Sequence, residues 1–223
     1  IKIIIKLQNI KLQQNYRLGK FKINFQNYSL KNLHKESDLF FDWYLKYCFK
    51  SSKLKKIKDT IKNELTKIYK KLYFHNNTFV HRDFHASNIM MNKKVIGLID
   101  SQDAIVGNPL YDVVSLIDDV RIKLPINLQN KLLKFYYSKS KFKRENFQNL
   151  KNDYDILSVQ RNLKILGIFV RLYKRDNKSN YLKYLPYTWQ LIDRRMKNPI
   201  FNKLNILLKK YLSLKKLKNI KKI

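Results

Sequence analysis

Glycine and cysteine are both scarce in this chain of 223 residues. The four glycines, Gly19, Gly97, Gly107 and Gly167, lie far apart, so they cannot form a glycine-rich phosphate-binding loop. The single cysteine, Cys48, excludes an intramolecular disulfide and a cysteine-based zinc site. No apolar run is long enough to cross a bilayer and no signal peptide is recognisable, which predicts a cytoplasmic protein.

Acidic residues are also few, because 16 aspartates and glutamates stand against 48 lysines and arginines, giving a formal net charge of +32. Such a balance ordinarily suggests nucleic acid or an anionic membrane as a partner. However, the excess is mostly lysine spread along the whole chain among many Asn, Ile and Tyr residues, a pattern that an AT-rich genome imposes on any protein. We therefore expect only nonspecific, salt-dependent attraction to nucleic acid, and no membrane partner.

The stretch HRDFHASNIMMNKKVIGLID, residues 81–100, carries the strongest functional signal. Before it, Thr78 to Val80 is a short β-prone run, and within it 88–91 and 95–99 have the pattern of strands, the second that of a buried strand. The polar residues 92–94 are short enough to close a hairpin. The pattern predicts a loop followed by two antiparallel strands.

Three polar residues are then expected to converge at one edge of this small sheet. Asp83 lies in the loop, Asn88 begins the first strand and Asp100 ends the second. Asp83 and Asn88 have the spacing of a kinase catalytic loop, in which the aspartate orients or deprotonates the attacking hydroxyl and the asparagine binds Mg²⁺. Asp100 would supply the second Mg²⁺ ligand. A loop aspartate alone is more often a turn former, but the ordered set favours phosphotransfer.

At these residues the chain resembles the aminoglycoside phosphotransferase and choline kinase superfamily. It is most similar to the bacterial cell-wall sugar kinases that phosphorylate the anomeric hydroxyl of N-acetylmuramate and N-acetylglucosamine. The resemblance is carried by HRDFHASNIM at 81–90, GLIDSQDAIVGNPLYDVVSLIDDVR at 97–121, QRNLKILGIFVRLYKRD at 160–176 and YLPYTWQLIDRR at 184–195, with ESDLFFDWYL at 36–45 similar as well. One departure is Ser101, since these kinases usually have an aromatic residue there.

The resemblance implies an α+β, protein kinase-like fold with a predominantly helical C-terminal lobe and a small antiparallel β-hairpin that carries the catalytic loop and metal ligands. It implies ATP and Mg²⁺ as cofactors and a small-molecule sugar as substrate. The implied catalytic residue is Asp83, the metal ligands are Asn88 and Asp100, and the residues supporting the loop are His81, Arg82, His85 and Asp112. Candidates for contacts with the substrate or around the metal are Gln102, Asp103 and Arg161.

The rest of the chain is predicted to be largely helical. Ser37-Asp38 can cap a helix from Leu39 to about Phe49, with its aromatic residues in the core. Residues 1–10 suit a strand or a helix, and 13–29 suit a loop or linker. Further helices are expected at 51–72, 111–121, 125–137, 153–176, 180–197 with a break at Pro186, and 200–214.

Two cations interrupt the apolar helix expected at 153–176. Burying a cation is costly unless it is paired. We therefore expect Arg161 and Lys164 to pair with acids such as Asp112 or Asp155, or else to reach the substrate pocket.

The groups that hold a nucleotide in such kinases are not visible upstream of His81, where there is no room for a five-stranded lobe. The chain also begins with Ile rather than Met, which suggests a fragment. We expect residues 1–35 to be a remnant of the inter-lobe connection, 36–215 the C-terminal catalytic and substrate lobe, and 216–223 a basic tail.

The leading hypothesis is an ATP- and Mg²⁺-dependent kinase for a sugar hydroxyl, with N-acetylmuramate or N-acetylglucosamine as substrate in cell-wall recycling. One alternative is a catalytically incompetent lobe that binds nucleic acid or another polyanion. Another is a kinase for an aminoglycoside or choline, which would want an acidic pocket or an aromatic cage, respectively.

Overall fold

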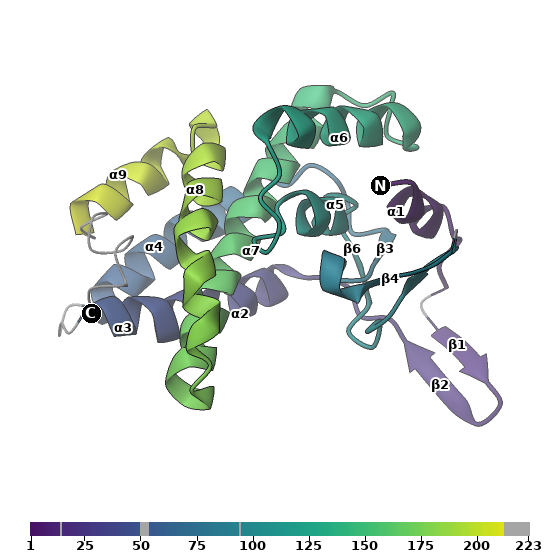
Figure 1. The fold of residues 1–223 in the computed structure, drawn as a ribbon. Helices are drawn as coiled ribbons and strands as arrows, with labels where there is room; N and C mark the ends of the chain where they lie inside the picture. Colours follow the sequence, from purple (N-terminus) through teal and green to yellow (C-terminus); the bar gives the residue numbers. More distant parts are fainter. Residues whose placement is uncertain (14, 50–53, 94, 212–223) are drawn as a thin grey trace. The chain divides into compact units, whose positions relative to one another are not determined.

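The computed structural model describes residues 1–13, 15–49, 54–93 and 95–211. It has the expected α+β class, with a majority of helix and small antiparallel sheets (Figure 1). The chain divides into two compact units, residues 1–29 with 73–154 in the first and residues 30–72 with those from 155 onward in the second. Within the described residues every helix is too short or too polar to span a lipid bilayer.

The first unit contains all the strands of the described chain, three complete α-helices and one short 3-10 helix. Its elements are α1 (Lys2–Gln8), β1 (Asn15–Leu18), β2 (Phe21–Asn24), β3 (Thr78–Val80), η2 (Ala86–Asn88), β4 (Ile89–Asn92), β5 (Val95–Leu98), β6 (Ile105–Gly107), α5 (Leu110–Ile117) and α6 (Ile126–Lys139). The strands form three antiparallel pairs, β1–β2, β3–β6 and β4–β5. The long helix α7 (Phe147–Asp176) begins in this unit and continues in the second.

Helix α5 is the centre of the first unit, because it is almost wholly buried. Leu110, Val113, Val114 and Ile117 have no exposed surface. Gln8 of α1 joins the neighbouring elements, since its amide donates to the Pro109 carbonyl at 2.7 Å and accepts from the Tyr136 hydroxyl of α6 at 2.7 Å. Residues 1–10 are therefore largely a helix, the second of the two predicted forms.

Strands β3 and β6 lead into and out of the residues expected to be functional. Their register pairs Thr78 with Gly107 and Val80 with Ile105. A third segment runs along β6, because Val106 donates to the Gln26 carbonyl at 2.9 Å and accepts from the Tyr28 amide at 2.8 Å. The N-terminal segment is thus hydrogen-bonded to the same small sheet that positions residue 81.

The second unit is helical throughout its described part. Its elements are α2 (Leu30–Leu39), the π-helical segment η1 (Phe40–Leu45), α3 (Lys46–Cys48), α4 (Leu54–Tyr69), the remainder of α7, η3 (Ser179–Tyr184), α8 (Leu185–Arg195), η4 (Pro199–Phe201) and α9 (Asn202–Tyr211). Tyr44, Leu65, Leu166 and Leu191 are fully buried in its core.

Aromatic residues anchor this second core, as expected from the sequence. The indole of Trp189 donates to the Tyr44 hydroxyl at 2.7 Å, and the Phe40 ring stacks on Tyr44 at a centroid distance of 5.4 Å. Cys48 is buried in the same helical stretch, as a small apolar residue.

A glycine allows α7 to approach the junction of α2 and η1 very closely. A Cβ atom added to Gly167 would lie 2.2 Å from the Leu39 carbonyl oxygen and 2.7 Å from the Phe40 nitrogen. Both neighbours are backbone atoms, which cannot rotate away as a side chain would. The contact falls where the helix changes from α to π geometry, a distortion that loosens the backbone ladder locally.

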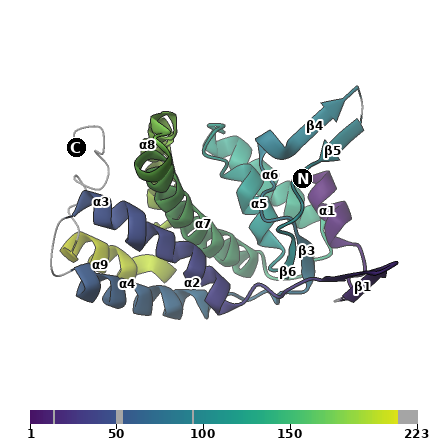
Figure 2. The same ribbon diagram turned by 90° about the horizontal axis from the view of Figure 1, so that it is seen from below.

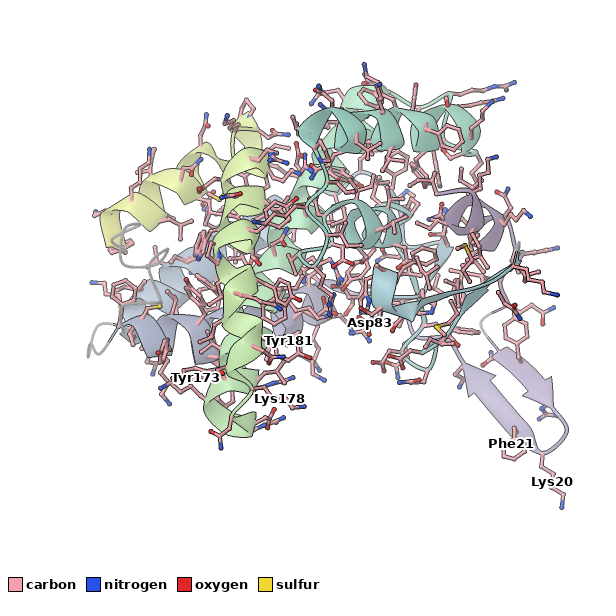
Figure 3. All side chains as sticks on the ribbon, in the orientation of Figure 1. Lys20, Phe21, Asp83, Tyr173, Lys178 and Tyr181 are labelled. Carbon is pink, nitrogen blue, oxygen red and sulfur yellow. The ribbon has the colours of Figure 1, made fainter. Side chains whose placement is uncertain are left out.

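Several predicted boundaries were wrong. The helix expected to begin after Ser37-Asp38 begins at Leu30, and the Ser37 hydroxyl donates to the Leu33 carbonyl within it. The expected loop at 13–29 contains the β1–β2 hairpin, whose tip carries Lys20 and Phe21 (Figure 3).

Two further expectations also failed. Helix α7 begins at Phe147, six residues before the predicted start. The strand at 95–98 was expected to be buried but is largely exposed, with Val95 at 70% and Ile96 at 48%. The predicted helices at 51–72, 125–137 and 180–197 are confirmed in outline within the described residues, whereas the expected tail at 216–223 lies outside them.

Candidate active site

The loop between β3 and β4 is held at its start by the buried carboxylate of Asp112. One oxygen of this side chain accepts from the His81 amide at 2.7 Å and the other from the Arg82 amide at 3.1 Å. Asp112 lies in the first turn of α5, where free amides and the helix dipole favour a negative charge. The start of the loop is therefore tied to the most buried helix of the first unit.

Two residues of the expected site have a backbone conformation that L-residues rarely adopt. Arg82 has φ of 70° and Asp100 has φ of 69°, both in the left-handed region. Such residues cost about 1–3 kcal/mol each and persist where the surrounding structure enforces them, often at functional sites. Two of the four such non-glycine residues in the described chain thus flank the sequence segment expected to hold the site.

A second buried carboxylate, Asp119, binds the far part of the loop. It accepts from the Ala86 amide at 3.1 Å and from the amide of Arg121 at 3.1 Å, and its exposed fraction is 3%. The sequence pattern did not single out Asp119. The only signal was an Asp118-Asp119 pair directly after an apolar helix, in a chain that has few acids.

Asp83 and Asn88 lie within this held loop, and their positions are coupled. The Asn88 amide group donates to the Asp83 carbonyl at 3.0 Å, and the His85 amide donates to the same carbonyl at 3.0 Å. Figure 3 shows Asp83 beside η2, the short turn that leads into β4. Because the Asn88 nitrogen is used in this bond, its side-chain oxygen remains as the group that can bind a cation.

Asp100 is brought to the same end of the β4–β5 hairpin as Asn88. The register pairs Ile89 with Leu98, and the pairing extends one step further because the Ile99 amide donates to the Asn88 carbonyl at 3.1 Å. Asp100 is the next residue along the chain. The hairpin, whose two strands are drawn as broad arrows in Figure 2, therefore brings Asn88 and Asp100 to one end of the sheet.

The carboxylates of Asp83, Asp100 and Asp103 have no hydrogen-bond or ion-pair partner within the part of the chain that the structure describes. By contrast, Asp112, Asp119 and Asp153, in the same unit, all accept hydrogen bonds and are buried. Acids that stay unpaired among so many lysines are available to a ligand.

The two histidines of the motif differ in environment. His81 is buried, with its ring edge-on to Phe84 at a centroid distance of 6.0 Å, and neither of its ring nitrogens has a hydrogen-bond partner among the described residues. His85 is half-buried and its backbone closes the turn at Asp83.

Gln102 and Asp103 line a polar cleft of about 250 Å³ that also includes Arg82. The Arg82 guanidinium donates to the Asp103 carbonyl at 3.4 Å, a long hydrogen bond. The cleft further includes Asn24 and Gln26, which sequence reasoning missed because nothing in the pattern of residues 13–29 indicated that they approach this loop.

Arg161 is buried in the part of α7 that belongs to the second unit, where Lys164 pairs with Glu36 at 3.0 Å. Lys164 is thus paired as expected, but with an acid that was not anticipated. Asp155, one of the expected partners, lies 4.0 Å from Arg195 and accepts from the Asn198 amide group at 3.0 Å.

The donor set at the hairpin end fits Mg²⁺, which binds oxygen ligands and commonly takes one or two carboxylates together with substrate phosphates. Asp100 offers an exposed carboxylate and Asn88 an amide oxygen. Among the described residues there is no group of three or more His, Cys, Asp or Glu side chains that could hold a metal by themselves.

The sequence matches a known protein family. Residues 28–146 match the phosphotransferase enzyme family, so the chain is a member of that family. The match includes the loop between β3 and β4, the β4–β5 hairpin, and both carboxylates that hold this loop.

Several kinases are similar in sequence to part of this chain. The chain is 33% identical over 119 residues to an N-acetylmuramate/N-acetylglucosamine kinase of Pseudomonas aeruginosa, covering 52% of this chain and 35% of that protein. It is 37% identical over 112 residues to the kinase of the same name from Neisseria meningitidis, covering 48% and 34%. A third, from Caulobacter vibrioides, is 29% identical over 139 residues, covering 60% and 38%. The chain thus matches little more than a third of the length of each relative.

Proposed function

We propose that the chain carries the catalytic and sugar-binding part of an ATP- and Mg²⁺-dependent kinase that phosphorylates a hydroxyl of an N-acetylated amino sugar, N-acetylmuramate or N-acetylglucosamine. The observation that carries the proposal is the convergence of Asn88 and Asp100 at one end of the hairpin, with Asp83 hydrogen-bonded to Asn88 through its carbonyl. The names of the relatives support the choice of substrate.

In this mechanism Asp83 accepts a hydrogen bond from the attacking sugar hydroxyl and takes its proton as the new sugar O–P bond forms, while the bond between the γ-phosphorus and the bridging oxygen of ATP breaks and ADP leaves. Its unpaired carboxylate is ready for this role. Asn88 and Asp100 would hold Mg²⁺, which neutralises charge between the phosphates when bound. Phosphoryl transfer depends chiefly on positioning and electrostatics, so the rigid attachment of the loop to α5 would contribute directly to the rate.

The carboxylates of Asp112 and Asp119 have a separate role in this proposal. They contact the backbone of the loop rather than any reacting atom. They therefore act as positioning residues that hold Asp83 and Asn88 in the geometry required for transfer. His81, Arg82 and His85 would support the loop through their backbone and packing.

The test is sugar-dependent formation of ADP by the longest open reading frame that contains this chain, with N-acetylmuramate, N-acetylglucosamine, an aminoglycoside and choline as acceptors. We expect turnover with the amino sugars only, and Asp83→Asn should lower it by about a thousandfold. Asp59→Asn, which removes one acid from the surface of α4, is the matched control and should retain wild-type turnover.

Retained turnover in Asp83→Asn would remove this residue from the mechanism. Turnover with choline or an aminoglycoside alone would replace the proposed substrate.

A further inference from the structure

The polar cleft beside the catalytic loop is formed entirely within the first unit. It is lined by Asn24, Gln26, Arg82, Gln102, Asp103, Ala104 and Ile105 and has a volume of about 250 Å³. Its lining comes mainly from two segments far apart in sequence, the end of β2 with the following residues and the loop between Asp100 and β6. Arg82, one of the lining residues, directly precedes Asp83.

Both walls of the cleft are fixed to the same sheet as the catalytic loop. Gln26 is held by the hydrogen bond from the Val106 amide to its carbonyl, and Tyr28 by the bond from its own amide to the Val106 carbonyl. Val106 belongs to β6, which pairs with the strand that ends at Val80. The segment carrying Asn24 and Gln26 is therefore attached to the strand pair that leads into the loop between β3 and β4. A ligand in the cleft would be held at a defined position relative to this loop.

The cleft is lined by three side-chain amides and one carboxylate, all able to form hydrogen bonds. Asn24, Gln26 and Gln102 each offer an amide donor and an amide acceptor, and Asp103 offers a carboxylate. No residue of the described chain hydrogen-bonds to any of these four side chains. Ala104 and Ile105 add a small apolar surface.

The side chains that line the cleft suit a sugar better than a polyphosphate or a polycation. A polyphosphate needs several cations, yet Arg82 is the only cation in the lining and Asp103 opposes it. A polycationic ligand needs several acids, and the lining has one. Vicinal hydroxyls suit paired amides and a carboxylate, and an acetamido group needs a donor, an acceptor and a place for its methyl group. The volume lies below the roughly 300–1,000 Å³ of pockets for drug-sized ligands, which suits a single sugar ring.

We propose that this cleft is the acceptor subsite, in which Asp103, Asn24, Gln26 and Gln102 bind the hydroxyl and acetamido groups of one N-acetylated amino sugar and so present its reacting hydroxyl to Asp83. The inference rests on the proposed function and adds to it the residues that select the sugar. Asp103 binds a pair of ring hydroxyls, and the amides with Ile105 recognise the acetamido group.

The test measures binding of N-acetylglucosamine and of glucose to the 223-residue chain by saturation-transfer NMR, without nucleotide. Asp103→Asn should weaken binding of N-acetylglucosamine about tenfold, as expected for a lost hydrogen bond to a charged group. Asn24→Ala should weaken it about threefold, as for a neutral hydrogen bond, and glucose should bind more weakly than N-acetylglucosamine to the wild-type chain. Matched controls are Asp59→Asn and Asn130→Ala, both at helical positions outside the cleft, which should bind as the wild type does.

The outcomes separate this inference from the proposed function. If the wild-type chain binds the sugar and both cleft variants bind equally well, the subsite assignment is overturned while the sugar kinase proposal stands. If the wild-type chain binds neither sugar, both fail. Circular dichroism melting curves identify any variant that does not fold, and because Asn24 and Asp103 lie on separate segments, one variant suffices to decide the assignment if the other unfolds.

Discussion

The two units use their few acids in different ways. In the first unit, three buried carboxylates, those of Asp112, Asp119 and Asp153, accept from backbone amides. In the second unit, buried carboxylates face side chains, as Glu36 does with Lys164 at 3.0 Å. The difference follows from secondary structure. A helix satisfies its own amides except at its ends, whereas an irregular loop must find acceptors elsewhere.

This contrast explains how a chain with 16 acids and 48 basic residues can hold an irregular loop in place. A lysine cannot accept a hydrogen bond, so surplus positive charge is of no use to a backbone amide. Acids in the first unit are therefore not interchangeable with other polar residues. In the second unit, Glu36 belongs to an ion pair with Lys164, and such a pair can be replaced as a whole.

The largest expected effect is that of Asp112→Ala. Two loop amides would lose their acceptor in a buried place, each at a cost of about 1–3 kcal/mol, so the free energy of unfolding should fall by about 2–6 kcal/mol. Turnover should fall by about a hundredfold or more, because the loop that carries Asp83 would lose its left-handed turn and misplace the reacting groups. Urea denaturation and sugar-dependent ADP formation measure the two effects.

Asp119→Ala gives a graded comparison for Asp112. It removes the acceptor of one amide of the β3–β4 loop, that of Ala86, together with that of the Arg121 amide outside this loop. Its loss of stability should therefore be similar to that of Asp112→Ala, whereas its loss of turnover should be smaller, with the KM for sugar unchanged. A full loss of turnover with wild-type stability would show that Asp119 acts on the reaction itself and would contradict the positioning role.

The next effect concerns the ion pair of the second unit. Glu36→Leu leaves Lys164 without its carboxylate and removes an acceptor of the Gln160 amide, which should cost about 3 kcal/mol. Adding Lys164→Met should recover most of this loss, since replacing a buried pair by apolar residues is often neutral.

No second-site change is expected to rescue Asp112→Ala in the same way, because the backbone amides cannot be removed. If the double change at Glu36 and Lys164 is no more stable than the single one, the proposed distinction between the two units fails. Urea denaturation of the two variants measures this recovery.

The smallest effect is a dependence of stability on pH at Asp153. Burial raises the pKa of this carboxyl above its ordinary 3.8, while hydrogen bonds from the Tyr73 and Phe74 amides and from the Asn108 amide group oppose the rise. The proton is therefore held more tightly in the folded state. The stability that this contributes is fully present below the ordinary pKa of 3.8 and is lost as pH rises through the folded pKa.

Asp153→Asn should remove this dependence. Urea denaturation between pH 4 and 7 should show the wild-type chain losing stability relative to Asp153→Asn as pH rises. If the wild-type chain instead gains stability relative to Asp153→Asn as pH rises, the three hydrogen bonds to the carboxylate outweigh the effect of burial on its pKa.

Periodicity and motif spacing predicted the parts of the molecule that depend on local sequence. The hairpin around residues 92–94 follows from two β-prone runs and a short polar turn. Helix α4 follows from apolar residues at three- and four-residue intervals. The order of Asp83, Asn88 and Asp100 predicted their convergence, and the register of β4 and β5 brings the last two to one end of the hairpin.

What could not be predicted depends on contacts between distant segments. The β1–β2 hairpin has no clean alternation of apolar and polar residues, since its strands carry Arg17 and Lys22 opposite each other. Strand β6 was not predicted, because its pairing partner β3 lies on the far side of the loop at 81–88 and the β4–β5 hairpin. The Glu36–Lys164 pair joins residues 128 positions apart. No local pattern carries such information.

The exposed hairpin has a consequence for how the protein behaves at high concentration. Among the described residues β4 and β5 pair only with each other, so each leaves an unpaired edge, and Met90, Met91, Val95 and Ile96 are all at least 48% exposed. Such edges invite strand addition between molecules. The net charge of +32 opposes that encounter by repulsion, and salt screens the repulsion within about 10 Å at 0.1 M. Colloidal stability should therefore be greatest in dilute buffer and decline as ionic strength increases.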